Sequence, residues 1–115
     1  MRAFLICPVR GRDPDLYAKV VADLEDHGYQ VHWPPRDTNQ EDDTGYQICT
    51  DNRAAIKAAD VVCIIWDGQS QGCLFDMGMA FALRKPVYVW RAPPRTEGKS
   101  FQNMMYIWEK ESCKR

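Results

Sequence analysis

The sequence predicts an α/β fold of flavodoxin-like kind, a three-layer sandwich around a mostly parallel sheet of four to five strands. Short apolar runs alternate along the chain with segments of helical period, as they do in proteins built from βαβ units. The 115 residues are enough for one hydrophobic core and too few for two. We therefore expect a single domain over residues 1–115.

Each element follows from local signals taken in chain order. Continuous apolar runs such as AFLIC and VVCIIW are typical of buried parallel strands. Asp13 is expected to cap the first helix, which Gly28 ends, and Ser70 is expected to cap the third. The predicted elements are a strand at 3–7, a helix at 13–27, a strand at 29–33 ended by Pro34 and Pro35, a polar loop at 36–44, a helix at 45–59, a strand at 61–66, a helix at 70–83, a strand at 86–90 and a helix at 100–111.

Composition excludes several function classes. The net charge is −1 and the basic residues are spread along the chain, so we expect neither a nucleic-acid polymer nor a membrane as partner. The start of the chain is typical of a first strand rather than a signal peptide. The five cysteines show no CxxC and no paired spacing, which indicates reduced, packed thiols in a cytoplasmic protein. No metal cluster or cofactor motif is present.

The predicted sheet places the ligand site on particular loops. Open parallel sheets bind ligands outside the carboxyl ends of their strands. The loops concerned begin at Pro8, Pro34, Asp67 and Arg91, and three of them carry polar motifs: CPVRGRD, WPPRD and WDGQSQG.

The first two motifs have a functional and a structural interpretation each. Arg10 and Gly11 lie before a helix N-terminus, a setting that suits a phosphate group, although Arg10 could be surface charge. Trp33, Arg36 and Asp37 could stack on and hydrogen-bond a heterocycle. The alternative is a stiff turn in which Arg36 and Asp37 pair with each other.

The third motif leads into an apolar helix that contains a carboxylate. Asp67, Ser70 and Gly72 are followed by Asp76, the one charged residue between Gly72 and Leu83. A carboxylate is costly to bury, so Asp76 is either functional or solvated. Asn52 is a second polar residue on an apolar helical face, either a satisfied core group or one that points into the same region.

Three segments together resemble the nucleoside 2-deoxyribosyltransferase family, and most of all its branch of 2′-deoxynucleoside 5′-monophosphate N-glycosidases. The resemblance covers residues 3–110 and is carried by RGRDPDLYAKVVADLEDHG, DNRAAIKAADVV and SQGCLFDMGMAFALRKPV. It implies cleavage of the bond between a base and a deoxyribose. A carboxylate attacks the anomeric carbon, a glycosyl-enzyme intermediate forms, and a second base or water takes the sugar.

The resemblance also implies roles for individual residues. Asp76 matches the nucleophile, while Ser70, Arg10 and Gly11 match positions near the sugar or its 5′-phosphate. Asn103 falls near an asparagine that reaches into the neighbouring subunit's site, which implies a homodimer or a larger assembly with shared active sites. The expected ligand is a small-molecule nucleoside or nucleotide, without a cofactor or a metal.

The chain departs from the family pattern at three linked positions. Asp76 is shorter than the family's glutamate, and a misplacement of about 1 Å can cost about 100-fold in rate. Asn52 replaces an aspartate that helps to protonate the substrate, and Phe4 replaces the tyrosine that holds the nucleophile. Either the chemistry is rearranged, or the fold serves as a non-catalytic nucleotide-binding or interaction protein. Acids that could take over the lost role are Asp37, Asp51 and, best placed, Asp67.

Overall fold

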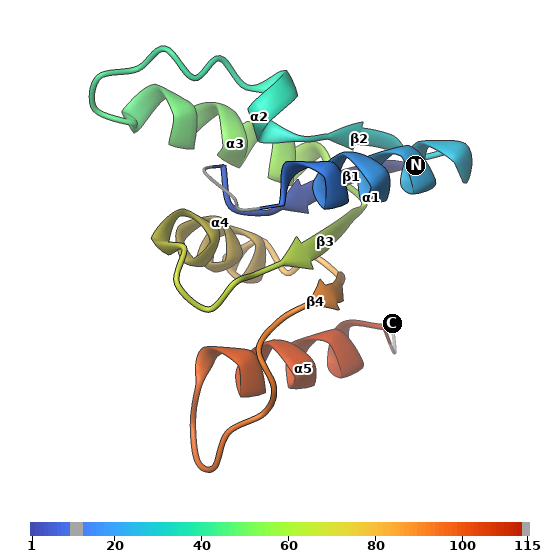
Figure 1. The fold of residues 1–115 in the computed structure, drawn as a ribbon, viewed down its shortest axis with the longest axis vertical. Helices are drawn as coiled ribbons and strands as arrows, with labels where there is room; N and C mark the ends of the chain where they lie inside the picture. Colours follow the sequence, from blue (N-terminus) through green and yellow to red (C-terminus); the bar gives the residue numbers. More distant parts are fainter. Residues whose placement is uncertain (10–12, 114–115) are drawn as a thin grey trace.

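The computed structural model describes residues 1–9 and 13–113, and within them it contains a four-stranded, fully parallel sheet in the order β2-β1-β3-β4 (Figure 1). The predicted α/β architecture is confirmed. The strands are β1 (Arg2–Ile6), β2 (Gln30–His32), β3 (Val61–Ile65) and β4 (Val87–Arg91). The helices are α1 (Pro14–Asp26), α2 (Pro34–Asp37), α3 (Tyr46–Ala58), α4 (Gln71–Ala82) and α5 (Phe101–Ser112).

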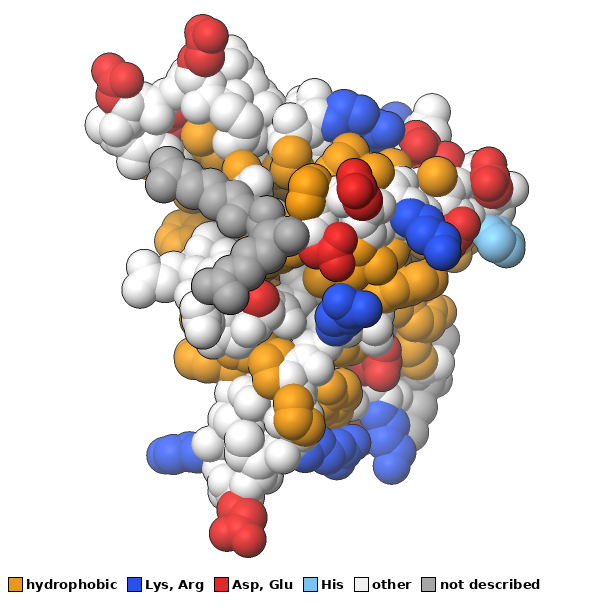
Figure 2. Space-filling view, in the orientation of Figure 1, with side chains coloured by type: hydrophobic (Ala, Val, Ile, Leu, Met, Phe, Trp, Pro, Cys, Tyr) orange, Lys and Arg blue, Asp and Glu red, His pale blue; other side chains and the backbone are white. Residues whose placement is uncertain are grey.

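The two faces of the sheet have separate hydrophobic cores. Successive strand residues point to opposite faces, so Ala3 and Leu5 pack with α1, whereas Phe4 and Ile6 pack on the other face. That second core includes residues of α3, α4 and α5, among them Ile56, Met77, Ala80, Met105 and Trp108. Acidic and basic side chains are interspersed on the face where α1 lies (Figure 2), in keeping with the small net charge.

Strand β4 lies at the edge of the sheet, and α5 supplies acceptors for its outer N–H groups. The Val87 N–H donates to the hydroxyl of the buried Ser112 over 3.0 Å, and the Val89 N–H donates to the Glu109 carboxylate. Unpaired edge groups invite pairing with another chain. These two hydrogen bonds satisfy the N–H groups of Val87 and Val89 within the molecule.

The segment after the second strand differs from the sequence prediction. The two prolines were expected to end the strand and lead into a loop at 36–44, but Pro34–Asp37 form the short helix α2. Proline fits the first turn of a helix, where its missing N–H is not needed. The Asp37 carboxylate accepts from the Trp33 N–H at 2.9 Å and closes the turn, and the Thr38 N–H ends it on the Pro34 carbonyl at 3.0 Å.

The cysteines, all of which lie within the described residues, are unpaired. Cys7, Cys63 and Cys73 are buried, Cys49 is half-buried and Cys113 is exposed. None of the described helices is long and apolar enough to cross a membrane.

Candidate active site

Asp76 lies in the second turn of α4, on the side where that helix packs against α3. The helix begins at Ser70, whose hydroxyl accepts from the Cys73 N–H at 3.3 Å, so the predicted cap is confirmed. Burial raises the pKa of Asp76 to about 7, and a side-chain hydrogen bond with Asn52 opposes that rise. Asp76 is therefore a partly buried carboxylate with a polar partner, not a solvated surface acid.

Asn52 belongs to a chain of polar side chains that leads away from Asp76. Its amide oxygen accepts from the Thr38 hydroxyl at 2.8 Å, and the Thr38 oxygen lies 2.8 Å from His32 Nε2. Thr38 and Asn52 are both buried. The chain His32–Thr38–Asn52–Asp76 thus joins β2, the end of α2, α3 and α4.

Phe4 lies directly beside this chain. The parallel register pairs Phe4 with His32, and their rings stack with centroids 5.3 Å apart and planes 7° from parallel. Phe4 is fully buried and has no hydroxyl to offer. It supports His32 by packing alone.

Among the described residues, three thiols lie near enough to Asp76 for its charge to affect their pKa. Burial raises the pKa of Cys7 to about 11 and that of Cys73 to about 12, and the negative charge of Asp76 adds to both. The pKa of Cys49 on α3 is also raised, first by burial and then by the negative charge of Asp76. At neutral pH these thiols are uncharged, so they do not compete with Asp76 for a cation or a proton.

The loop between β3 and α4 is held by Asp67. Its Oδ1 accepts from the N–H groups of Gln69 at 2.9 Å and Ser70 at 2.7 Å. Among the described residues, a Cβ at Gly72 would meet only the Ser70 hydroxyl, at 3.9 Å, so no described side chain fills the space beside Gly72 in the first turn of α4. The N-terminal N–H groups of that turn favour an anion.

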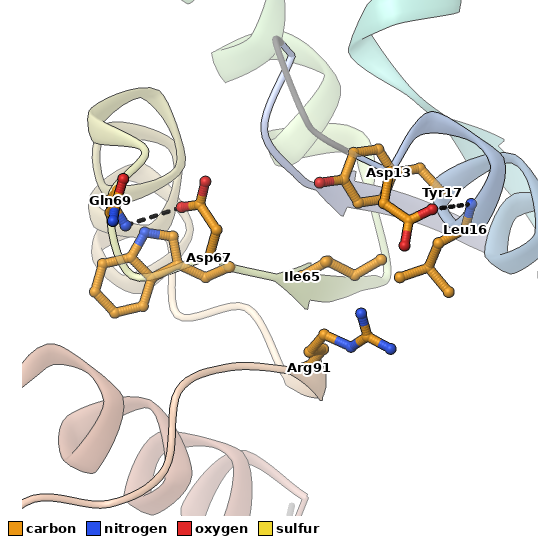
Figure 3. A pocket seen from close by; sticks show the side chains of 8 residues that line it. Asp13, Leu16, Tyr17, Ile65, Asp67, Gln69 and Arg91 are labelled. Atoms are coloured by element: carbon orange, nitrogen blue, oxygen red, sulfur yellow. Dashed lines mark hydrogen bonds between the residues drawn. The ribbon is translucent and has the colours of Figure 1, made fainter.

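A cavity of about 320 Å³ opens at the carboxyl ends of β3 and β4, next to this loop. Figure 3 shows Tyr17 of α1 and Asp67 on opposite sides of it, with Arg91 reaching in from the end of β4. Its remaining lining residues are Asp13, Leu16, Ile65, Trp66 and Gln69. The cavity lies where the open parallel sheet predicts a ligand site, and it combines apolar walls with charges of both signs.

Comparison with known proteins gives the family. A family model described as nucleoside 2-deoxyribosyltransferase matches residues 4–106. The chain belongs to the nucleoside 2-deoxyribosyltransferase family. No curated protein sequence matches the chain significantly.

Two solved structures share the fold of this family member. A 2-deoxyribosyltransferase from Bacillus psychrosaccharolyticus aligns with a TM-score of 0.69 and 20% identity over 85% of this chain and 77% of that one. The CMP N-glycosidase BcmB from Clostridium botulinum aligns with a TM-score of 0.66 and 18% identity over 95% of this chain and 84% of that one. The family is one of enzymes, so this deoxyribosyltransferase homologue is an enzyme.

The second sequence motif of the homologue folds back on itself. Arg36 bonds Asp37 at 2.9 Å, the Val31 carbonyl at 2.9 Å and Glu25 of α1 at 3.4 Å. This is the pairing of the stiff-turn alternative. The Trp33 indole N–H lies near the Cys7 thiol and meets no stronger acceptor among the described residues.

The remaining predicted residues lie in two places. Pro8 is buried at the end of β1, whereas Arg10 and Gly11 fall outside the described residues. The Asn103 amide accepts from the Thr96 N–H at 3.0 Å and donates to the carbonyls of Thr96 at 2.8 Å and Gly98 at 2.7 Å. Asn103 therefore holds its own loop, and its contribution to a neighbouring site stays a prediction.

Sequence reasoning did not identify two residues of this row of hydrogen-bonded side chains, His32 and Thr38, as site residues. His32 was assigned only to a strand, and Thr38 only to a polar loop. The one available signal was the alternation in YQVHW, which places His32 and Val31 on opposite faces of the sheet. Over residues 1–9 and 13–113, no three His, Cys, Asp or Glu side chains are grouped to hold a metal ion.

Proposed function

We propose that the protein cleaves the N-glycosidic bond of a nucleoside or its 5′-monophosphate, with Asp76 as the nucleophile. The observation that carries this is the partly buried Asp76 carboxylate, which is hydrogen-bonded by Asn52 in a chain of the nucleoside 2-deoxyribosyltransferase family. Hydrogen bonds to a carboxylate favour its ionised form, the form that can attack carbon.

The proposed reaction has two steps. A carboxylate oxygen of Asp76 forms a bond to the anomeric carbon, and the bond to the base breaks, with the base taking the electron pair. Water or a second base then attacks the same carbon and releases Asp76. Because only ionised Asp76 reacts, kcat/KM should rise with pH up to about 7.

The departing base needs a proton, and Asn52 cannot supply one. We propose Asp67 for this role, because it holds the loop that leads from the carboxyl end of β3 into α4, the helix that carries Asp76. One of its oxygens already bonds two backbone N–H groups, which fixes the orientation of the carboxyl group. Asp67→Asn keeps the shape of this turn, because the asparagine oxygen can still accept from the two N–H groups. We therefore expect this variant to lower the rate of base release while the free energy of unfolding stays close to the native value.

The N-terminus of α4 supports a phosphorylated substrate. Ser70 and the open position beside Gly72 lie at its positive end, where a 5′-phosphate would be stabilised. We propose that Arg10 and Gly11 complete this phosphate site. A 5′-monophosphate should accordingly be a better substrate than its nucleoside.

We also propose a homodimer in the cytoplasm. Large apolar side chains are exposed on two helices: Phe75 and Phe81 on α4, and Phe101, Met104 and Ile107 on α5. Phe81, Met104 and Ile107 among them line one shared hollow, and an exposed apolar surface of this kind is typical of an interface. The five unpaired thiols fit a reducing compartment. Sedimentation of the native chain, compared with a Phe81→Asp/Ile107→Asp variant, tests the assembly.

The reaction is tested by base release from a panel of nucleosides and 5′-monophosphates, followed by chromatography. We expect Asp76→Ala to abolish release, and the matched variant of an exposed loop acid, Asp43→Ala, to keep it. A 2-fluoro-deoxyribosyl substrate should leave its sugar on the peptide that contains Asp76, visible by mass spectrometry. Full activity of Asp76→Ala, or an adduct on another carboxylate, contradicts the proposed nucleophile.

A further inference from the structure

We propose that Thr38 and His32 are positioning residues that act through Asn52, aiming its amide N–H at the Asp76 carboxylate. The proposal rests on the proposed role of Asp76 as nucleophile. It assigns a task to two side chains that act on Asp76 through Asn52 rather than by hydrogen bonds of their own.

The direction of the hydrogen bonds follows from the single hydroxyl proton of Thr38. That proton is donated to the Asn52 amide oxygen at 2.8 Å. The Thr38 oxygen, 2.8 Å from His32 Nε2, must then accept from that nitrogen, so His32 carries its proton on Nε2. With its oxygen occupied, Asn52 has its amide nitrogen left for Asp76, and an N–H donor is what a carboxylate requires.

Without Thr38 the orientation of the amide would not be fixed. The two ends of an asparagine amide have nearly the same shape, and only their hydrogen-bond partners distinguish them. An amide turned by half a rotation would present its oxygen to Asp76 and repel the ionised form. In that orientation the amide N–H would donate to the Thr38 oxygen, the Thr38 hydroxyl would donate to His32 Nε2, and His32 would carry its proton on Nδ1. A His32 proton on Nε2 therefore marks the orientation that serves Asp76.

The fold holds Thr38 and His32 rigidly. Thr38 ends α2, its N–H bonds the Pro34 carbonyl at 3.0 Å, and its side chain is buried. His32 is clamped by the Phe4 ring, with centroids 5.3 Å apart. The short helix α2 thus brings a hydroxyl from the end of β2 to Asn52 on α3.

The charged groups near His32 do not reverse the hydrogen bonds from His32 through Thr38 to Asn52 at neutral pH. Burial lowers the pKa of His32; the charges of Asp37 and Asp51 oppose this and that of Arg36 adds to it. Neutral His32 can still donate from Nε2. The described titratable groups that face Asp76 are the protonated thiols Cys7, Cys49 and Cys73.

The test compares Thr38→Val, which removes the hydroxyl at constant shape, with Thr38→Ser, which keeps it. We expect Thr38→Val to raise the pKa of the Asp76 carboxyl, followed by ¹³C NMR in the free protein, by about one pH unit. The acid limb of kcat/KM should move by the same amount, and Thr38→Ser should restore both. In the native protein at pH 8, ¹⁵N NMR should find the His32 proton on Nε2.

His32 offers an independent pair of variants, which also serves if Thr38→Val does not fold. His32→Gln keeps an N–H donor and should leave the Asp76 titration near its native position, whereas His32→Leu should raise it. An unchanged Asp76 titration in Thr38→Val or His32→Leu, or a His32 proton on Nδ1, overturns the proposal. The NMR readouts need no substrate, so they stand even if Asp76 proves not to be the nucleophile, and that failure would show only in the adduct experiment.

Discussion

Replacing Asp76 with asparagine should stabilise the protein, and more so as the pH rises. Burial raises the pKa of Asp76 to about 7, from an ordinary value of 3.8. The folded state therefore binds the Asp76 proton more tightly than the unfolded state does. The associated stability is fully present below pH 3.8 and is lost as the pH rises through 7.

The size of the effect follows from the two pKa values. Each pH unit between them is worth about 1.4 kcal/mol, so complete ionisation of Asp76 costs the folded state about 4 kcal/mol. Asparagine has the same shape and never ionises, and its side-chain oxygen can still accept from Asn52. The free energy of unfolding of Asp76→Asn should thus equal that of the native protein near pH 4 and exceed it by about 2–4 kcal/mol near pH 8.

Urea unfolding at several pH values between about 4 and 8.5 measures this difference. Every other carboxyl group is common to the two proteins. The contribution of those groups to the pH dependence of stability therefore cancels when the two free energies of unfolding are subtracted. Asp43→Asn, at an exposed loop acid, is the matched control and is measured over the same pH range. If the free-energy difference between Asp76→Asn and the native protein is the same at all pH values, the burial of an ionisable Asp76 is refuted.

Three further substitutions test other contacts. Lys85→Met removes an ammonium that bonds the carbonyls of Lys57 at 2.8 Å and Ala59 at 2.7 Å, at the end of α3, and should cost about 1–2 kcal/mol in thermal or urea unfolding. Ser112→Ala leaves the Val87 N–H without its acceptor and should cost about 1–3 kcal/mol, whereas a loss below about 0.5 kcal/mol would show that β4 does not depend on α5. Asn52→Asp restores the family's residue but places a second carboxyl group against Asp76, so the acid limb of kcat/KM should move to higher pH. A gain in activity without that shift would show that the amide has no part in holding Asp76.

Most of the fold could be predicted because it depends on local patterns. The apolar runs of β1 and β3 and the helical period of α1 and α4 each lie in one continuous segment. The Ser70 cap depends on residues three positions apart, within reach of sequence reasoning. The short helix α2 was missed because two prolines end a strand and begin a helix equally well.

The polar chain at Asp76 could not be predicted because its links join distant segments. Thr38 and Asn52 are separated by 14 positions, and they meet only once α2 and α3 have packed. Sequence reasoning found Asp76 and Asn52 through their unexpected polarity on apolar helical faces. Thr38 and His32 gave no such signal, since a threonine in a polar loop and a histidine in a strand are unremarkable on their own.

The polar chain gives a common physical explanation to the three departures from the family pattern that the resemblance implies. Phe4 has no hydroxyl to offer the carboxylate, and its ring is instead the flat surface against which His32 stacks. With an amide in place of an acid at Asn52, two carboxyl groups no longer compete for one proton, and the amide can donate to Asp76. An aspartate at position 76 is one methylene shorter than a glutamate, and here its carboxyl group has Asn52 of α3 as its polar partner. The substitutions are thus mutually consistent, because each fits a carboxylate that is held from α3 rather than from β1.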